Sequence, residues 1–362
     1  MTTVSQKAKS IPPIQAYRQR LRRNTGIVIV LFLITLILAF FSLNSGSADT
    51  NTIQIISTLF GNPSSEISNI VVWNIRLPRI VAGMIAGAGL AVAGCVVQTV
   101  LKNPLASPST LGISNAAAFG ANIAILFLGA GGVSSSSKQI VSIQNPYLVS
   151  ISAFIFSMVL TGLILTISRL RKFTPETVIL AGVAFGSLFS AGSTLLQYFA
   201  EDVQVAAMVF WTFGDLGRVS WKEIGILGVV VLGASIYFLA RRWDFNALDS
   251  GEEMAKSLGV NVEQVRFGGM LASSLITAVS VSFMGIISFV GLIAPQMMRR
   301  ILGVDHKYLI PASAILGSVI LLFSDTIART IISPIVLPVG AITSFFGAPL
   351  FLFLLVKGYS KS

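Results

Sequence analysis

The side chains that could do chemistry in this chain are few, and the most informative of them are three arginines. Arg76 and Arg79 flank a Leu-Pro pair in front of a long apolar segment, and Arg329 closes a later one. A guanidinium group can hold a carboxylate through two parallel hydrogen bonds, and at a helix end it can also reach phospholipid headgroups. The spacing alone leaves two interpretations open: docking of an acidic external partner, or anchoring at the membrane surface.

Asp325 is the only acidic residue well inside an apolar segment, and it lies four residues before Arg329. On a helix this spacing places the two side chains beside each other, as a structural ion pair near the outer surface would require. Buried ionisable residues also mark the paths of coupling ions in membrane carriers. One acid with a local partner favours the structural pair, and an ion-coupled secondary transporter stays as the alternative from a different class.

Residues for catalysis or for metal binding are missing from the sequence. The one cysteine, Cys95, lies in an apolar segment, and the one histidine, His306, lies in a charged turn. These two residues cannot assemble an ordinary zinc or haem site, an intramolecular disulfide or a nucleophilic triad. The phosphate-binding pattern Gly-x-x-x-x-Gly-Lys-Ser/Thr does not occur. We therefore expect no catalytic residue, no metal and no cofactor in this chain, and we expect that it is not an enzyme.

The composition places these residues in a membrane protein. Of 362 residues, 54% are hydrophobic and only 11% are charged, whereas soluble domains carry about 25% charged residues. A helix needs about 20 apolar residues to span a bilayer, and apolar segments of this kind recur along the whole chain. They lie near 27–43, 79–100, 111–129, 147–168, 177–199, 222–240, 266–284, 288–298, 310–331 and 339–356. The sequence predicts an all-α integral membrane protein, a polytopic bundle of about ten transmembrane helices in one domain, 25–362.

The eighth of these segments is short and interrupted by Pro295, which predicts a half-helix or re-entrant element covered by protein or by a water-filled cavity. Two pairs of glycines spaced by four, Gly83 with Gly87 and Gly182 with Gly186, predict close helix packing. These glycines indicate a tight bundle and say nothing about the substrate.

The basic residues set the predicted orientation. The net charge is +11, but Lys and Arg gather at the ends of apolar segments, which argues for membrane topology and against nucleic-acid binding. With the N-terminus inside, most of the Lys and Arg residues fall on the inner side. Residues 1–24 then form a basic cytoplasmic tail before a retained first helix, and both termini of this multi-pass protein are cytoplasmic.

One predicted inner loop, 244–263, is too structured to be a linker. It mixes acidic, basic and apolar residues, with Ala255, Leu258 and Val262 on one face of a predicted helix. We therefore expect this loop to be an amphipathic element on the cytoplasmic side.

Several ordered motifs then resemble the permease family of bacterial ABC importers for iron-siderophores and cobalamin. In the first half these are Ile75-Arg-Leu-Pro-Arg-Ile80, the glycine-rich stretch Gly87–Gly94, Gln98, Asn103-Pro-Leu-Ala-Ser-Pro108 and Leu111-Gly112. In the second half they are Ser257-Leu-Gly-Val260, Phe289-Val-Gly-Leu-Ile293, Pro295, Asp305-His306, Leu337-Pro-Val-Gly340 and Gly347-Ala-Pro349. The similarity extends over nearly the whole chain from about residue 27.

The resemblance implies a type II ABC importer permease with ten spans per subunit. It implies a second permease copy, as a homodimer or close heterodimer, with the substrate passing along their interface. It also implies two cytoplasmic ATPase subunits, which would bind ATP and Mg²⁺, and an external binding protein that delivers the chelate. The cargo favoured by the family is a ferric siderophore, with cobalamin and haem as alternatives.

The same resemblance assigns roles to particular residues. Arg76, Arg79 and Arg329 match positions that meet acidic residues of the binding protein, which favours docking over lipid anchoring. The remaining positions form a cytoplasmic gate, at Asn103, Leu105, Thr174 and Pro175, and an ATPase coupling element, at Ser257, Leu258 and Gly259. Two residues depart from the family pattern: Gln296 stands where histidine is usual, and Ser250 stands where leucine is usual. We expect both departures to alter the contact with the ATPase.

Overall fold

The computed structural model describes residues 13–46, 51–63, 65–133, 141–143, 145–170 and 174–359. Of the predicted basic tail, residues 1–12 lie outside this range, and residues from Pro13 onward already belong to the first helix. Apart from short 3-10 and π-helical turns, the helices are α1 (Pro13–Asn44), α2 (Thr52–Leu59), α3 (Glu66–Ile70), α4 (Leu77–Val100), α5 (Ile113–Phe127), α6 (Pro146–Leu170), α7 (Pro175–Phe199), α8 (Asp202–Thr212), α9 (Trp221–Ala240), α10 (Arg242–Asp249), α11 (Glu252–Ser257), α12 (Val262–Met284), α13 (Val290–Leu302), α14 (His306–Thr330) and α15 (Val339–Tyr359).

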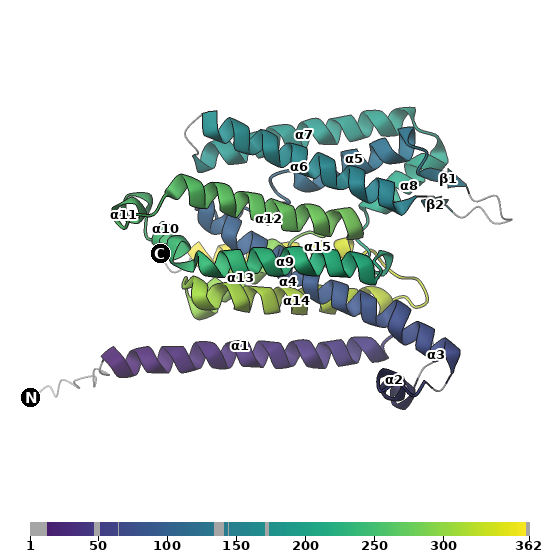
Figure 1. Ribbon diagram of the computed structural model, residues 1–362, viewed down its shortest axis with the longest axis horizontal. Coiled ribbons are helices and arrows are strands. Elements are labelled where there is room, and N and C mark those ends of the chain that lie inside the picture. The colour runs from purple at the N-terminus through teal and green to yellow at the C-terminus, as the bar shows by residue number, and fades with distance from the viewer. Residues whose placement is uncertain are drawn as a thin grey trace, which may run out of the picture.

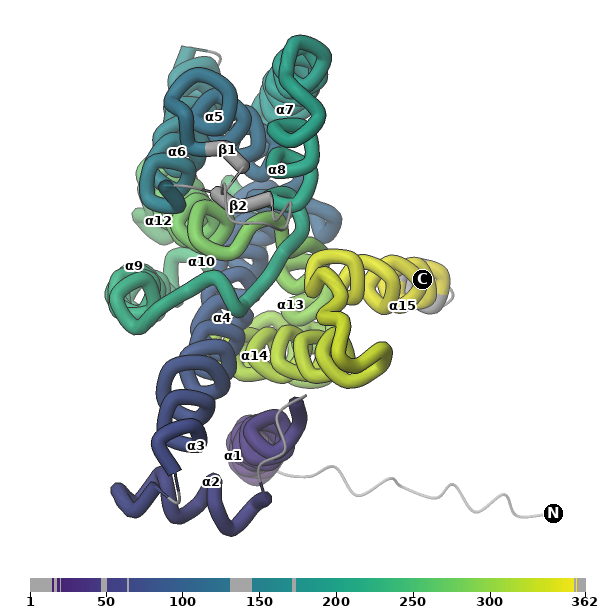
Figure 2. The backbone as a smooth tube through the Cα atoms, turned by 90° about the vertical axis from the view of Figure 1, so that its right-hand side faces the viewer, coloured from purple at the N-terminus to yellow at the C-terminus, as the bar shows by residue number. Residues whose placement is uncertain are grey.

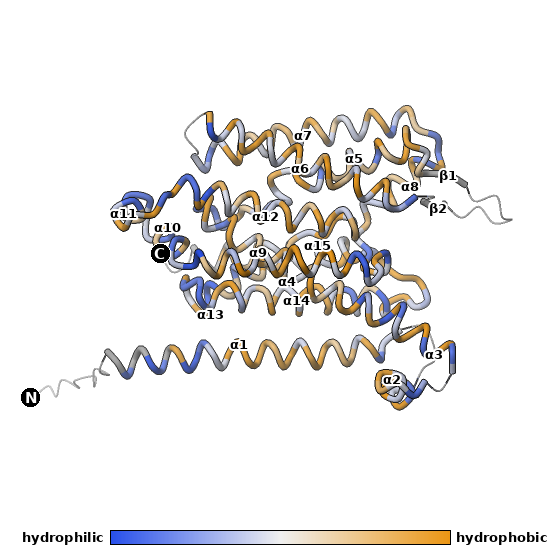
Figure 3. The backbone as a smooth tube through the Cα atoms, in the orientation of Figure 1, coloured by the Kyte–Doolittle hydropathy of each residue, from blue (hydrophilic) through white to orange (hydrophobic). Residues whose placement is uncertain are grey.

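The predicted all-α membrane architecture is confirmed. Each of the ten apolar segments coincides with a helix, and the helices lie side by side along one axis (Figure 1). Seven helical segments in the described ranges are long and apolar enough to cross a membrane, while α5 and α15 are shorter apolar helices. Apolar residues fill the middle of the bundle and polar residues gather at its two ends (Figure 3). We call these the α2 end, which carries α2 and α3, and the α10 end, which carries α10 and α11.

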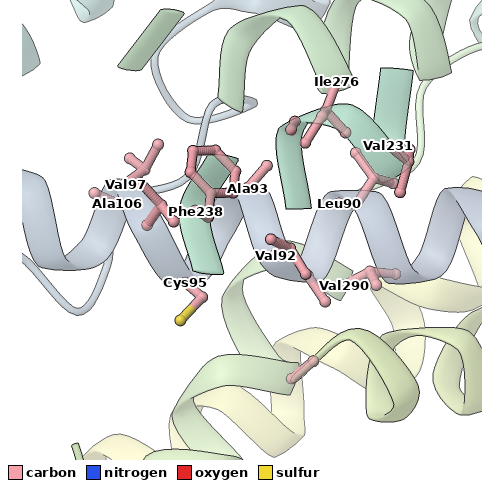
Figure 4. Packing of buried hydrophobic residues seen from close by; sticks show 14 of the residues in the cluster. Leu90, Val92, Ala93, Cys95, Val97, Ala106, Val231, Phe238, Ile276 and Val290 are labelled. Atoms are coloured by element: carbon pink, nitrogen blue, oxygen red, sulfur yellow. The ribbon is translucent and has the colours of Figure 1, made fainter. Parts of the chain in front are cut away.

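Helix α4 lies at the centre of the bundle, with α9, α13 and α14 around it (Figure 2). Glycines permit this position because they let neighbouring backbones approach closely. A Cβ on Gly87 would lie 2.4 Å from the Gly317 carbonyl oxygen of α14, and one on Gly94 would lie 1.8 Å from the Gly291 carbonyl oxygen of α13. Between Leu90 and Val97 the helix packs against apolar side chains such as Val231, Phe238 and Val290 (Figure 4).

The second glycine pair also packs as predicted. A Cβ on Gly182 or on Gly186 of α7 would lie 3.0 Å from the backbone of Leu111 or Gly112, at the start of α5. The outer faces of α1, α7 and α9 instead expose large apolar side chains, among them Ile37, Leu180 and Val229. Such faces suit lipid or another apolar surface.

The predicted half-helix is α13, a helix of 13 residues that contains Pro295. It follows an irregular segment between α12 and Phe289, a residue in the left-handed conformation. Here three backbone segments meet: the Gly214 carbonyl accepts from the Val339 N–H (2.8 Å), and Phe213 forms a β-bridge with Ile286. Irregular backbone is tolerated at membrane depth where other protein segments cover it, and these contacts provide that cover.

Two features of the fold were not predicted. Helix α8 follows α7 with 11 residues, too few for a span. The Gly/Ser-rich segment near 129–145 contains a short antiparallel pair, β1 (Gly131–Val133) and β2 (Val141–Ile143). Residues 134–140 between these strands lie outside the described part of the chain.

Candidate functional site

Two of the three arginines, Arg79 and Arg329, meet at the α2 end around one carboxylate. Asp325 of α14 is fully buried, its Oδ1 lies 2.8 Å from Arg79 Nε, and its Oδ2 lies 3.0 Å from Arg329 Nε. The expected Asp325–Arg329 pair is therefore confirmed. Arg79 also lies 3.2 Å from Asp215, which precedes the 3-10 turn Leu216–Arg218. The carboxylate is shared by helices α4 and α14, so it fastens them together.

Further polar contacts of Arg76 and Arg329 reach the end of α1. Arg329 donates to the Ser42 hydroxyl (2.6 Å) and to the Ser45 carbonyl (2.8 Å), and Arg76 donates to the Leu43 carbonyl (2.8 Å). Positive charges near the C-terminus of a helix stabilise it, because the last backbone carbonyls have no hydrogen-bond partner within the helix. The three guanidinium groups are buried within this chain, with residue exposures of 4–9%. Docking of a binding protein through them stays a prediction of the sequence.

The predicted gate residues Asn103 and Leu105 lie in the loop that follows α4. The Asn103 side-chain oxygen accepts from the Leu105 N–H (2.8 Å), and its carbonyl accepts from the Ala106 N–H (3.1 Å). These bonds form a tight turn that leaves the Leu105 side chain 44% exposed at the α10 end. We call residues 101–108 the gate loop.

A chain of amides holds the gate loop against α13. Gln98 donates to the carbonyls of Gly291 (3.4 Å) and Leu292 (3.3 Å), so its oxygen is turned toward Gln296. Gln296 then donates to the Gln98 oxygen (3.1 Å) and to the Pro104 carbonyl (3.0 Å). The backbone carbonyls accept only, and this fixes the orientation of both amides. We expected Gln296 to affect the ATPase contact, but it donates hydrogen bonds to α4 and to the gate loop.

The other predicted gate residues, Thr174 and Pro175, begin α7, and the Thr174 hydroxyl caps this helix by accepting from the Thr177 N–H. They line a cavity of about 730 Å³ at the α10 end, together with Lys102 from the gate loop. The predicted inner loop 244–263, which we call the coupling loop, supplies Glu252 and Lys256 to the same cavity. The structure therefore brings part of the predicted gate and part of the predicted coupling element to one cavity, whereas Asn103 and Leu105 are not among its lining residues.

The predicted coupling loop folds as two short helices and a turn. Gly259, with φ of +80°, ends α11 and turns the chain into α12. Ala255 and Val262 are buried, but Leu258 is 66% exposed because it lies at the turn. The prediction that these three residues share one face of a single helix is wrong, because α11 ends at Ser257 and α12 begins only at Val262. Ser257 is also exposed, and its hydroxyl donates to the Met254 carbonyl and sulfur.

Inside this loop Glu252 forms two ion pairs, with Lys256 (2.9 Å) and Arg266 (2.9 Å). The hydrogen bond from Lys256 and the charge of Arg266 hold the pKa of Glu252 below its usual value, outweighing its modest burial. The pair fastens α11 to the first turns of α12.

A second polar cluster, which the sequence did not predict, joins the coupling loop to α4. Arg299 of α13 pairs with Asp249 of α10 (3.2 Å) and donates to the Thr99 hydroxyl of α4 (2.5 Å). His306, predicted in a charged turn, is instead the first residue of α14 and is fully buried between Thr99 (2.9 Å) and Asn246 (2.8 Å). Burial raises the pKa of Asp249 despite the nearby Arg299.

Sequence reasoning missed this cluster because its members are up to 207 residues apart. Ser250, the second departure from the family pattern, lies beside it. Its hydroxyl donates to the Asn246 carbonyl (3.2 Å), and its side chain lines a cavity of about 530 Å³ with Asp249 and Arg299. Among the described residues, no three His, Cys, Asp or Glu side chains are grouped as metal ligands.

An apolar bundle of membrane-spanning length, with a structured loop at one end, defines the class of multi-pass membrane proteins. The chain belongs to the FecCD transport family, which matches residues 34–357. The sequence motifs indicated a permease of the ABC type, and this class is now established. The alternative of an ion-coupled carrier is therefore dropped.

Proteins similar in sequence to this chain are also named as permeases. The chain is 54% identical to an ABC transporter permease protein of Methanocaldococcus jannaschii over 92% of its own length and 95% of the relative's. It is 33% identical to the hemin transport permease of Yersinia pestis (86% and 91%) and 33% identical to the Fe(3+)-citrate import permease of Bacillus subtilis (91% and 94%). A solved inward-facing metal-chelate type ABC transporter superposes with a TM-score of 0.77 at 29% identity, over 92% of this chain and 99% of that one. These relatives are named as transport components.

Proposed function

We propose that this chain is the transmembrane subunit of an ATP-driven importer that carries a ferric siderophore from an external binding protein into the cytoplasm. The relatives named for hemin and for ferric citrate support an iron chelate as the cargo. These two chelates differ in size and charge, so haem is kept as an alternative, as is cobalamin. In this proposal the α2 end is external and the α10 end is cytoplasmic, in a bacterial inner membrane.

The observation that carries the proposal is the surface of the coupling loop. Helices α10 and α11 lie at one end of the bundle, next to the N-terminus of α12 (Figure 1). These helices and the turn after α11 expose Trp243 (68%), Met254 (53%) and Leu258 (66%) beside charged side chains. Apolar side chains grouped on an otherwise polar surface indicate a protein-binding site. An ATPase subunit seated here would contact a loop that is joined to the helices of the bundle.

A second permease copy completes the proposed path. Helix α7 is largely uncovered, and its exposed face carries Ser187, Ser190 and Thr194 between larger apolar side chains. Hydroxyl groups gain little from lipid, whereas a path between two copies would bring them to water and cargo. A path lined by small and apolar groups would release a bulky chelate readily. The cargo would then pass by alternating access, with ATP binding favouring one of two conformations.

The test is ATP-dependent uptake into proteoliposomes that hold the permease, its ATPase and its binding protein. We expect a stable permease–ATPase complex in detergent, hydrolysis that changes when binding protein is added, and uptake of a ferric siderophore in preference to hemin or cobalamin. Preferential uptake of hemin or cobalamin would refute the ferric siderophore as the cargo but would support the importer function. Uptake by the permease alone, driven by a proton gradient, would refute the importer.

The coupling surface can be tested separately. Leu258→Ser removes an exposed apolar side chain from the coupling loop, and Phe60→Ser, the control, removes one that is 82% exposed at the other end. We expect Leu258→Ser to weaken ATPase binding about tenfold, as loss of one buried anchor at an interface does, and Phe60→Ser to leave it unchanged. Equal effects of both substitutions would show that α10 and α11 are not the ATPase site.

A further inference from the structure

Helix α13 has contacts to both the coupling loop and the gate loop. Its residues Gln296 and Arg299 are three positions apart and so lie on the same side of the helix. Arg299 reaches Asp249 of the coupling loop, and Gln296 reaches the Pro104 carbonyl of the gate loop. No catalytic or cargo-binding role has been assigned to any of these residues.

Helix α13 is also fixed to α4, so the two helices have little freedom to move apart. Gly94 and Gly291 bring their backbones into direct contact, so there is no space for even a Cβ between them. Arg299 donates to the Thr99 hydroxyl and to the Cys95 carbonyl (3.3 Å) of α4. Close backbone packing with several hydrogen bonds makes a rigid pair. The gate loop begins where α4 ends, so it is attached to this pair at its start.

The contacts that join this helix pair to the coupling loop and to the gate loop are weaker than the packing inside the pair. The Asp249 and Arg299 side chains keep 18% and 17% exposure, and the Gln296–Pro104 bond lies at the surface of the α10 end. An ion pair that water reaches, or a neutral hydrogen bond, can be broken and remade at moderate cost. The α4–α13 helix pair is therefore rigid, whereas its contacts with the two loops can rearrange. An element that transmits movement from one loop to another needs both properties.

We propose that α13 transmits the movement of the coupling loop to the gate, with Arg299 and Asp249 as the input contact and Gln296 as the output contact. The proposal rests on the importer function proposed above. Arg299, Asp249 and Gln296 are positioning residues: they set where the gate loop lies and do not contact ATP or cargo. When the ATPase moves α10, Asp249 carries α13 and α4 with it, and Gln296 holds the gate loop to the moving helix.

The input contact is tested by a double-mutant cycle on the complete complex in proteoliposomes. Asp249→Asn and Arg299→Gln should each raise the ATP hydrolysed per chelate imported by about tenfold, the effect expected for a lost charge-assisted hydrogen bond. The double variant should be no worse than the worse single one, because both substitutions remove the same contact. Additive effects, or uptake and hydrolysis that fall in proportion, would overturn this contact.

The matched control is the ion pair between Arg241 and Asp244 on the same loop, with a distance of 3.0 Å. It lies within one helical turn and does not reach α13. Arg241→Gln and Asp244→Asn should leave the ratio of hydrolysis to uptake unchanged. An equal rise in the control variants would mean that any ion pair in this loop matters, which would contradict a specific route through Asp249.

The output contact is tested by following the gate directly. Gln296→Glu keeps the shape of the side chain but places a carboxylate opposite the Pro104 and Gln98 oxygens, and Gln296→Met removes the donor without adding charge. Spin labels at Leu105 of both copies, in a Cys95→Ala background that retains uptake, report the gate distance. We expect ATP to change this distance in the background protein, and the change to be lost in both variants while ATP hydrolysis continues.

The outcomes separate this proposal from the proposed function. A gate distance that still follows ATP in both Gln296 variants would refute the output contact and leave the importer intact. If ATP changes neither the gate distance nor uptake in the background protein, the importer itself is refuted. Continued hydrolysis by the variant complexes shows that they are folded and assembled.

Discussion

The two ends of helix α4 are held in different ways. At the α2 end Arg79 is buried in an ionic cluster with Asp325, and its side chain is only 10% exposed. At the α10 end Gln98 and Thr99 make neutral or partly exposed polar contacts to α13 and α14. Breaking a buried ion pair leaves uncompensated charge in a dry interior, whereas exchanging a neutral hydrogen bond costs much less. The α2 end therefore fixes the helix, and the α10 end permits its surroundings to move.

Two ion pairs with the same spacing sharpen this difference. Asp325 with Arg329 and Glu252 with Lys256 are both four residues apart on a helix. The first pair has side-chain exposures of 0% and 8%, and the second has 38% and 62%. The two pairs cannot be distinguished by their spacing in the sequence, but their burial determines how much each contributes to stability. The first belongs to a fixed part of the molecule and the second to the coupling loop.

The largest effect is expected from Asp325→Asn. The amide keeps the shape of the carboxylate but cannot balance two buried guanidinium groups, so we expect a loss of about 3–5 kcal/mol in the free energy of unfolding. Thermal and denaturant unfolding of the purified permease in detergent measure this loss. Asp244→Asn, in the exposed pair with Arg241, is the control and should change stability by less than about 1 kcal/mol.

The same variant also tests the docking prediction for Arg79 and Arg329. If these arginines bind the binding protein, they must exchange Asp325 for a partner carboxylate, and freeing them in Asp325→Asn should tighten binding. If they serve only to join α1, α4 and α14, the variant should lose stability with no gain in affinity. A variant as stable as the native protein would show that the ionic cluster does not fix the α2 end.

A smaller loss is expected from Gly94→Ala, which places a methyl group 1.8 Å from the Gly291 carbonyl oxygen. Helices α4 and α13 must separate to accommodate it, and overpacking of this kind costs about 1–3 kcal/mol. Gly225→Ala in α9 is the matched control, because a Cβ there meets nothing within 4 Å. Unfolding of both variants under the same conditions gives the comparison. A neutral Gly94→Ala would contradict the rigid α4–α13 pair.

Most of the fold could be predicted because lipid imposes a simple rule on the sequence. Spans must be apolar and about 20 residues long, so ten apolar segments give ten helices, and Pro295 marks the short one. Helix α8 was missed because it follows α7 after a break of only two residues and is too short for a span. The continuous face of Ala255, Leu258 and Val262 was wrong because Gly259 adopts a left-handed conformation that ends the helix.

The site was predictable only where its residues are neighbours in sequence. The Asp325–Arg329 pair follows from a spacing of four residues. The Arg79–Asp325 contact joins residues 246 apart, and the sequence alone does not show which helices pack together. Gln296 was noticed as a departure from a family pattern, yet its contact with the Pro104 carbonyl depends on how α13 packs on α4. Asp249, Arg299 and Thr99 carry no local pattern that would have revealed their cluster.

The smallest effect is expected from Glu252→Gln in the exposed pair. The depressed pKa of Glu252 means that its ion pairs stabilise the folded state above the unfolded pKa of about 4.3, and that this contribution disappears as the pH falls through the lower folded value. The pair is partly exposed, so we expect a loss of only about 0.5–1 kcal/mol near neutral pH. Unfolding temperatures of the native and variant proteins, compared from about pH 7 down to about pH 3, should converge at the acidic end. A difference that persists at the lowest pH would mean that Glu252 acts through packing, and a loss as large as that of Asp325→Asn would remove the contrast between the two pairs.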